Sequence, residues 1–85
     1  MNPIIEIHAH AKQRATERGA TEVEIKTSVL QGETFPAKFS RIGSRMNFNF
    51  DGQWNGKLYR TKQVECYFVK EPDKWIVVTV IVKYF

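Results

Sequence analysis

The last eleven residues of the chain, "WIVVTVIVKYF" (Trp75–Phe85), decide the expected fold class. The run is short, β-branched and almost uncharged, which is typical of a strand with at least one buried face. Successive side chains of a strand point to opposite faces of the sheet. One set is Ile76, Val78, Val80, Val82 and Tyr84, and the other is Trp75, Val77, Thr79, Ile81, Lys83 and Phe85. The first set is drier, so we expect it to face the rest of the core.

The preceding segment "KLYRTKQVECYFVK" (residues 57–70) predicts a second strand, joined to the last one by the turn sequence "EPDK". Its drier set is Val64, Cys66 and Phe68. We therefore expect an antiparallel hairpin with helices over the Val64 and Val78 side. The second, wetter face then carries four side chains of functional interest: Glu65, Tyr67, Thr79 and Lys83.

The first third of the chain predicts two helices, at about 6–18 and 21–31. Gly19 ends the first helix, and Thr21 with Glu24 forms a capping box for the second. The apolar side of the second helix is expected to consist of Val23, Ile25, Val29 and Leu30. With a sheet from about residue 34 to 85, the chain is expected to form one α+β domain over 1–85. Its two N-terminal helices would pack on one face of a small antiparallel sheet.

The net charge of +4 is unevenly distributed. Between Thr34 and Lys62 there are six basic residues and one acidic residue, Asp51. A basic segment of this kind favours polyanions such as RNA, because each contact with a phosphate releases counterions. The alternative is a solvated surface that only keeps the protein soluble.

One cysteine, Cys66, excludes an intrachain disulfide and a thiolate zinc site, and we expect it to be an inert core residue. No targeting segment is recognisable at the N-terminus. The longest uncharged apolar run, Trp75–Val82, has eight residues, whereas a membrane helix needs about 20. We therefore expect a cytoplasmic protein without a membrane partner and without a cofactor.

Both histidines lie in "HAHAKQRATERG" (residues 8–19). His10 and Arg14 are four residues apart and share a helix face. Imidazole serves as an acid or a base near neutral pH, and a guanidinium stabilises developing phosphate charge, so this pair is the first catalytic candidate. His8 lies about 200° away around the helix. A two-histidine metal site needs spacing of four residues and a third ligand, so no metal site is expected. The alternative is a solvated helix face.

Three further groups are candidates. Lys57, Tyr59, Arg60 and Lys62 could hold phosphates, or they could form a charged edge strand that prevents aggregation. Glu65 could act as a base, or it could pair with Lys83 across strands. Tyr67, Thr79 and Lys83 complete the phosphate-binding candidates on the wetter face. Trp54 and Trp75 are expected to fill the core rather than to stack on bases.

The pattern His10-Ala11-x-x-Arg14, the helix stop Arg18-Gly19 and the exit Gly32-Glu33 resemble the family called domain of unknown function 4258. The closing apolar strand with an internal threonine, Thr79, is also similar to this family. The family is grouped by fold with RelE/ParE-type toxins and, more distantly, with barnase-like ribonucleases. The resemblance implies N-terminal helices against an antiparallel sheet and, in many members of the wider group, RNA cleavage without a metal. In barnase-like enzymes a sheet glutamate is the base, which implies that role for Glu65.

The expected function is therefore that of a toxin-like small protein that binds RNA or cleaves it without a metal. The alternative is a non-catalytic protein-interaction module that uses the wetter sheet face. Two classes of partner remain open at this point: RNA and an antitoxin-like protein.

Overall fold

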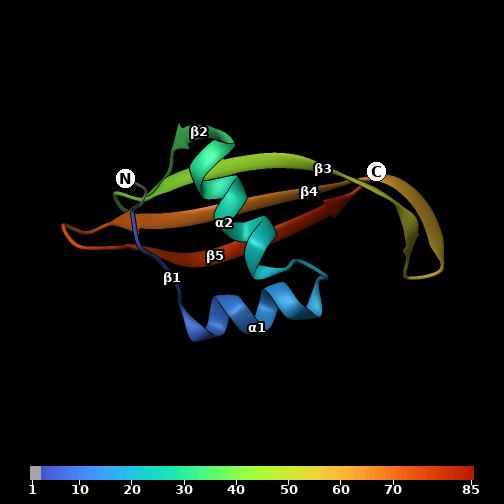
Figure 1. The fold of residues 1–85 in the computed structure, drawn as a ribbon, viewed down its shortest axis with the longest axis horizontal. Coiled ribbons are helices and arrows are strands. Elements are labelled where there is room, and N and C mark those ends of the chain that lie inside the picture. Colours follow the sequence, from blue (N-terminus) through green and yellow to red (C-terminus); the bar gives the residue numbers. More distant parts are fainter. Residues whose placement is uncertain (1–2) are drawn as a thin grey trace.

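The computed structural model describes residues 3–85 and shows an α+β fold with two helices and one five-stranded mixed sheet (Figure 1). In chain order the elements are β1 (Ile5–Ile7), α1 (Ala9–Glu17), α2 (Glu22–Gln31), β2 (Glu33–Pro36), β3 (Ile42–Trp54), β4 (Lys57–Lys70) and β5 (Trp75–Tyr84). The strand order is β1-β5-β4-β3-β2, in which β2 to β5 are antiparallel neighbours. The expectation of an α+β domain with N-terminal helices on a sheet is confirmed.

The expectation of a purely antiparallel sheet is wrong, because β1 pairs in parallel with β5, from Ile5 opposite Trp75 to Ile7 opposite Val77. This strand occupies residues that we expected to begin the first helix. Three residues are too few for a periodic signal, and the free edge of β5 supplies their hydrogen bonds. The helix instead begins after His8, whose Nδ1 accepts a hydrogen bond from the backbone N–H of His10 at 3.2 Å.

The β4–β5 hairpin is antiparallel as predicted, and Val64, Cys66 and Phe68 face the helices. The expected faces of β5 are only half right. Val80 lies opposite Cys66 but Val77 lies opposite Phe68, so Val78 is an extra residue in a β-bulge. An extra residue shifts the in-and-out alternation of side chains by one, so the residues before the bulge point to the opposite face from the one expected. The helix-facing set is therefore Trp75, Val77, Val80, Val82 and Tyr84, and Ile76 points the other way.

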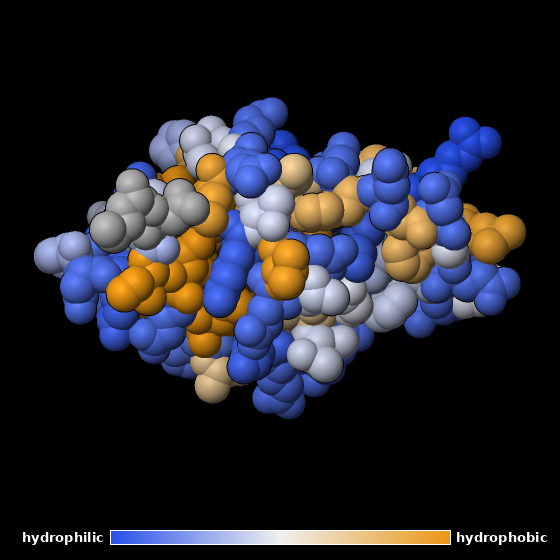
Figure 2. Space-filling model, viewed as in Figure 1, coloured by the Kyte–Doolittle hydropathy of each residue, from blue (hydrophilic) through white to orange (hydrophobic). Residues whose placement is uncertain are grey.

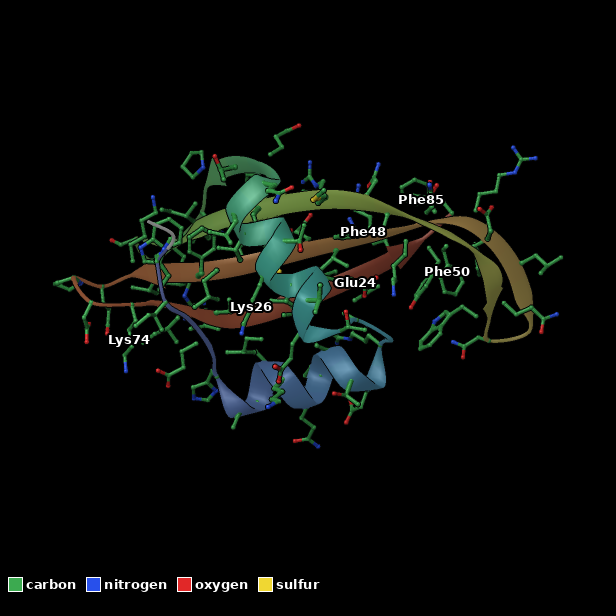
Figure 3. The ribbon with its side chains drawn as sticks, in the orientation of Figure 1. Glu24, Lys26, Phe48, Phe50, Lys74 and Phe85 are labelled. Carbon is green, nitrogen blue, oxygen red and sulfur yellow. The ribbon has the colours of Figure 1, made fainter. Side chains whose placement is uncertain are left out.

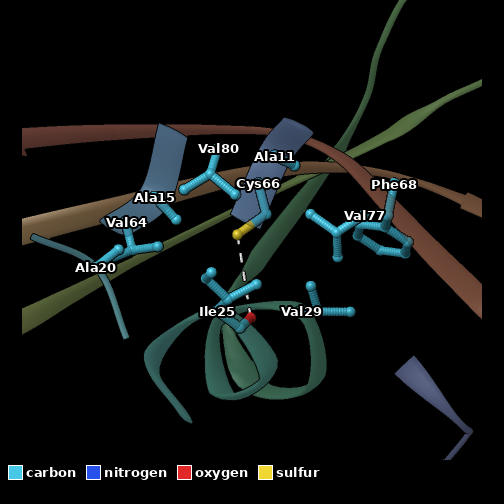
Figure 4. Packing of buried hydrophobic residues seen from close by; sticks show 10 residues of the cluster. All are labelled: Ala11, Ala15, Ala20, Ile25, Val29, Val64, Cys66, Phe68, Val77 and Val80. Atoms are coloured by element: carbon cyan, nitrogen blue, oxygen red, sulfur yellow. Dashed lines mark hydrogen bonds between the residues drawn. The ribbon is translucent and has the colours of Figure 1, made fainter. Parts of the chain in front are cut away.

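The core lies between the helices and this face of the sheet (Figure 4). Ala11 and Ala15 bring α1 close to β5, and Ile25 and Val29 bring α2 onto β4. The remaining core residues are Ala20, Val64, Cys66, Phe68, Val77 and Val80. Apolar side chains also gather between β1 and α2 on the face shown in Figure 2. Ile5 and Ile7 of β1 pack against the core.

Helix α2 has the predicted capping box. Thr21 Oγ1 accepts from the Glu24 N–H at 3.1 Å, and Glu24 Oε1 accepts from the Thr21 N–H at 2.9 Å. Its apolar side is narrower than expected, because Val23 is 74% exposed. Val23 lies about 200° around the helix from Ile25 and so points to solvent. Ser28 is the third residue of α2, after Ile25 and Val29, that faces the sheet, and its hydroxyl donates to the Val64 carbonyl at 3.1 Å.

Strands β3 and β4 form a long hairpin that extends beyond the helices (Figure 1). Its turn is Asn55–Gly56, with φ of 51° and 81°, which matches the Asn-Gly preference of tight hairpin turns. Trp54 stacks on Tyr84 with ring centroids 4.8 Å apart. Trp75 stacks on Phe68 at 5.5 Å. Both tryptophans are half-buried: Trp75 packs against the core, in line with the prediction, whereas Trp54 lies outside the core cluster, so its predicted core position is wrong.

Candidate functional site

A cleft of about 370 Å³ lies between α1 and the edge of β5. It is lined by His10, Ala11, Arg14, Arg18, Val78, Thr79 and Val80. The four-residue spacing of His10, Arg14 and Arg18 puts them on one stripe of α1 and its C-cap. Ala11 and Ala15 face the core, so this stripe borders the sheet edge. Beyond Val77, no strand within residues 3–85 covers that edge.

The predicted pair is in contact, because Arg14 Nε donates to His10 Nε2 at 3.1 Å. A guanidinium can only donate, so Nε2 of His10 must be the acceptor and the ring proton of neutral His10 lies on Nδ1. Arg18 Nη1 donates to the Val80 carbonyl at 2.8 Å and so blocks the open edge of β5. The free groups of all three side chains are N–H donors. This arrangement suits an anion.

The end of α1 is held in place by two bonds from the sheet. Tyr84 Oη donates to the Arg18 carbonyl at 2.6 Å, and Lys62 Nζ donates to the Gly19 carbonyl at 2.9 Å. These bonds satisfy carbonyls that the helix end leaves unpaired. They also fix the position of Arg18 relative to β5.

Lys62 is therefore a structural residue, and its predicted role in phosphate binding is wrong. Only 7% of the residue is exposed, and its ammonium lies 2.8 Å from Glu24 Oε1. Glu24 projects from the first turn of α2 over the sheet (Figure 3). The sequence placed Lys62 in a run of exposed cations, but alternation along β4 turns it toward the helices.

The other three residues of the predicted basic cluster lie on the extended hairpin. Lys57 and Arg60 are exposed, and Tyr59 is half-buried with its ring 5.7 Å from that of Tyr84. None of them lines the cleft of His10. The structure thus separates the candidate pair His10 and Arg14 from this cluster, because the first turn of α1 lies at the end of the sheet away from the hairpin turn (Figure 1).

Glu65, Tyr67, Thr79 and Lys83 share the sheet face away from the helices, as predicted. The sequence interpretation missed the main partner of Glu65. Arg45 Nε donates to Glu65 Oε1 at 3.0 Å, and Tyr67 Oη donates to Oε2 at 2.6 Å. The register of β3 and β4 creates this contact, which a single strand does not reveal. Lys83 contributes only its nearby charge.

This environment makes Glu65 a poor general base. Burial raises the pKa of its carboxyl, but the hydrogen bonds from Tyr67 and Arg45 outweigh burial and hold that pKa below its usual value of 4.5. The hydrogen bond to Glu65 in turn raises the pKa of Tyr67. Glu65 also does not line the cleft of His10. The structure thus separates two of the candidate catalytic residues.

A second hollow, of about 420 Å³, opens on the same sheet face. It is lined by Phe35, Pro36, Ala37, Lys38, Phe39, Arg41, Tyr67 and Thr79. Thr79 therefore lines both hollows. The sequence interpretation included Tyr67 and Thr79 but missed the aromatic and basic residues of the β2–β3 loop, since nothing in a loop sequence indicates which face it covers.

Comparison of the chain with protein-family models, with curated proteins and with solved structures found no match. Within residues 3–85, no three residues among the histidines, the cysteine and the acids are grouped to hold a metal ion. Neither helix in that range has the length and apolar character to cross a membrane.

Proposed function

We propose that the protein binds RNA and that the α1–β5 cleft holds one RNA phosphate. The observation that carries this proposal is the convergence of His10, Arg14 and Arg18 in one cleft. The cleft's lining residues include no carboxylate. Guanidinium and imidazole N–H groups form strong, charge-assisted hydrogen bonds with phosphate oxygens.

The charge of the whole chain supports a polyanionic partner. The net charge is +4, and the exposed Lys57 and Arg60 lie on the hairpin, outside the cleft. They would contribute to the attraction between protein and RNA without reading sequence.

The proposal includes membership in the RelE/ParE-like fold group and in the family called domain of unknown function 4258. Two observations support it. The helices are N-terminal and cover a sheet. The motif residues His10 and Arg14 meet in the cleft that we propose as the site.

If the cleft also cleaves RNA, the attacking 2′-hydroxyl would lose its proton to His10 Nε2 after Arg14 turns its hydrogen bond from that nitrogen to the phosphate. The imidazolium formed in this way would then return the proton to the leaving 5′-oxygen. The two arginines would stabilise the charge that develops on the phosphate. Glu65 has no part in this step, for the reasons given above.

Binding can be tested by fluorescence anisotropy with a labelled RNA strand over a range of salt concentrations. Arg14→Gln should weaken binding and reduce the salt slope by about 0.7, the value for one lost phosphate contact on a single strand. Lys26→Gln removes one charge from an exposed position outside the cleft and is the matched control. Equal effects of the two substitutions would show that the cleft holds no phosphate.

Cleavage can be tested with the two histidines. If His10 donates a proton in the reaction, His10→Ala should lower the rate by about 10²–10⁴-fold. His8→Asn removes the other imidazole but keeps a side chain that caps α1, so it should change the rate little. An RNA that stays intact with the parent protein would leave binding as the function and remove the catalytic part of the proposal.

A further inference from the structure

We infer that the second hollow, between the β2–β3 loop and the open sheet face, binds an unpaired nucleobase, so that the RNA taken by this protein is single-stranded. This inference rests on the proposed function and adds the class of RNA. It is carried by the aromatic and cationic side chains of that hollow, which have no role in the core.

The floor of the hollow is one row of residues across the sheet. Phe35 pairs with Gly43, Gly43 with Tyr67, and Tyr67 with Thr79. A Cβ on Gly43 would clash with the Phe35 ring, so the glycine lets that ring lie across the sheet. The ring then meets Tyr67 edge-on, with centroids 6.1 Å apart. The hydrogen bond from Tyr67 to Glu65 locks the second ring in place.

The rim of the hollow carries an aromatic residue in an unfavourable backbone conformation. Phe39 has φ of 61°, the following Ser40 has φ of 59°, and 83% of Phe39 is exposed. A bulky residue in the left-handed region raises the free energy of the folded state, and an exposed ring regains little of it by burial. Packing therefore does not explain this phenylalanine. Such strain is typical of residues that a ligand uses.

Cations surround these rings. The Arg41 guanidinium lies 5.7 Å from the centroid of Phe39, and that of Arg45 lies 4.9 Å from the centroid of Phe35. Lys38 also lines the hollow. Arg45 is paired with Glu65, the acid on the neighbouring row, so Lys38 and Arg41 supply the positive charge of the hollow. Aromatic faces with adjacent cations are the usual means of binding single-stranded nucleic acid, because every base has a face on which to stack.

Thr79 of β5 lines both hollows, so the two lie on either side of this one residue. A strand with one base against Phe35, Phe39 and Tyr67 could therefore continue around the edge of β5 to the phosphate cleft. A duplex could not do so, because its bases are paired and stacked inside the helix.

The test compares the parent protein with Phe39→Gly and Phe39→Trp, using three probes: an oligouridine strand, a duplex RNA and inorganic polyphosphate. Polyphosphate presents phosphates without bases. Phe39→Gly should weaken oligouridine binding by about 5- to 150-fold, the range for loss of one stacked base, and leave polyphosphate binding unchanged. Its Tm should stay the same or rise, because glycine relieves the left-handed conformation. Phe39→Trp should retain oligouridine binding. Leu58→Gly, at another exposed apolar residue, is the control for general loss of apolar surface.

Three results would overturn the inference. If Phe39→Gly binds oligouridine as well as the parent does, the hollow holds no base, while the proposed function survives. The same conclusion follows if duplex and single strand bind the parent equally tightly. If the parent binds none of the three probes, the proposed function fails as well, and the open face must serve another class of partner.

Discussion

The role of Lys62 can be tested most directly by Lys62→Met, which keeps the length of the side chain and removes its charge. The ammonium donates to the Gly19 carbonyl and pairs with Glu24 while only 7% of the residue is exposed. A hydrogen bond from a charged donor contributes about 1.5–3 kcal/mol. Glu24 would lose Lys62 as its partner but keep the hydrogen bond from the Thr21 N–H, so the loss of this ion pair adds little to the free-energy cost of the substitution. The substitution also removes the cation–π contact of the ammonium, which lies 5.6 Å from the centroid of the Phe50 ring.

We therefore expect Lys62→Met to lower the free energy of unfolding by about 2 kcal/mol, which corresponds to roughly 8–16 °C in Tm for a domain of this size. Urea unfolding followed by tryptophan fluorescence measures this, since Trp54 lies beside the end of α1. The slope of the free energy against urea should not change, because the folded state buries the same surface.

Arg60→Met is the matched control, because it removes the same charge from an exposed position two residues away on β4. Its effect on stability should stay within about 0.5 kcal/mol. If the two variants unfold at the same urea concentration, Lys62 does not hold α1 in place, and the argument for its structural role is wrong.

Three further outcomes are expected. The folded state lowers the pKa of the Glu65 carboxyl, so the stability that this carboxylate contributes is complete above pH 4.5 and is lost as the pH falls through the lowered pKa. Between pH 7 and pH 3, Glu65→Gln should therefore lose less free energy of unfolding than the parent protein does. Urea unfolding at both pH values measures this, and equal losses would contradict it. A Cβ at Gly19, where φ is 85°, would lie 2.5 Å from the Tyr84 hydroxyl. At Gly56 φ is similar, 81°, but a Cβ would meet only open space. Gly19→Ala should therefore lower Tm more than Gly56→Ala does. Cys66 is buried, and burial raises the pKa of its thiol to about 12. Iodoacetamide at pH 8 should therefore modify this thiol only after the protein unfolds. Rapid labelling of the native protein would show that the core opens.

Local chemistry determined several features of this protein. The capping box at Thr21 places the start of α2, and the apolar alternation of Val64, Cys66 and Phe68 defines the buried face of β4. The four-residue spacing of His10 and Arg14 is enough to predict their contact. Each of these rests on neighbours in the sequence, whose relative positions follow from helix or strand geometry alone.

Contacts between distant segments decided the rest. The strand β1 exists because β5 offers a free edge, and the bulge at Val78 becomes visible only when β5 is paired with β4. Lys62 belongs to a basic run in the sequence, yet the side of β4 that faces α2 buries it.

The candidate site shows the same division. His10 and Arg14 could be found by spacing, and Arg18 follows on the same stripe, but Tyr84 and Lys62 hold the end of α1 against β5 and so bring this stripe to the sheet edge. Arg45 reaches Glu65 through the register of β3 and β4, 20 residues apart in sequence, and changes that carboxylate from a candidate base into a paired anion. Side-chain periodicity is a local property, whereas register and the packing of helices on a sheet depend on the whole chain, so only the tertiary structure could decide them.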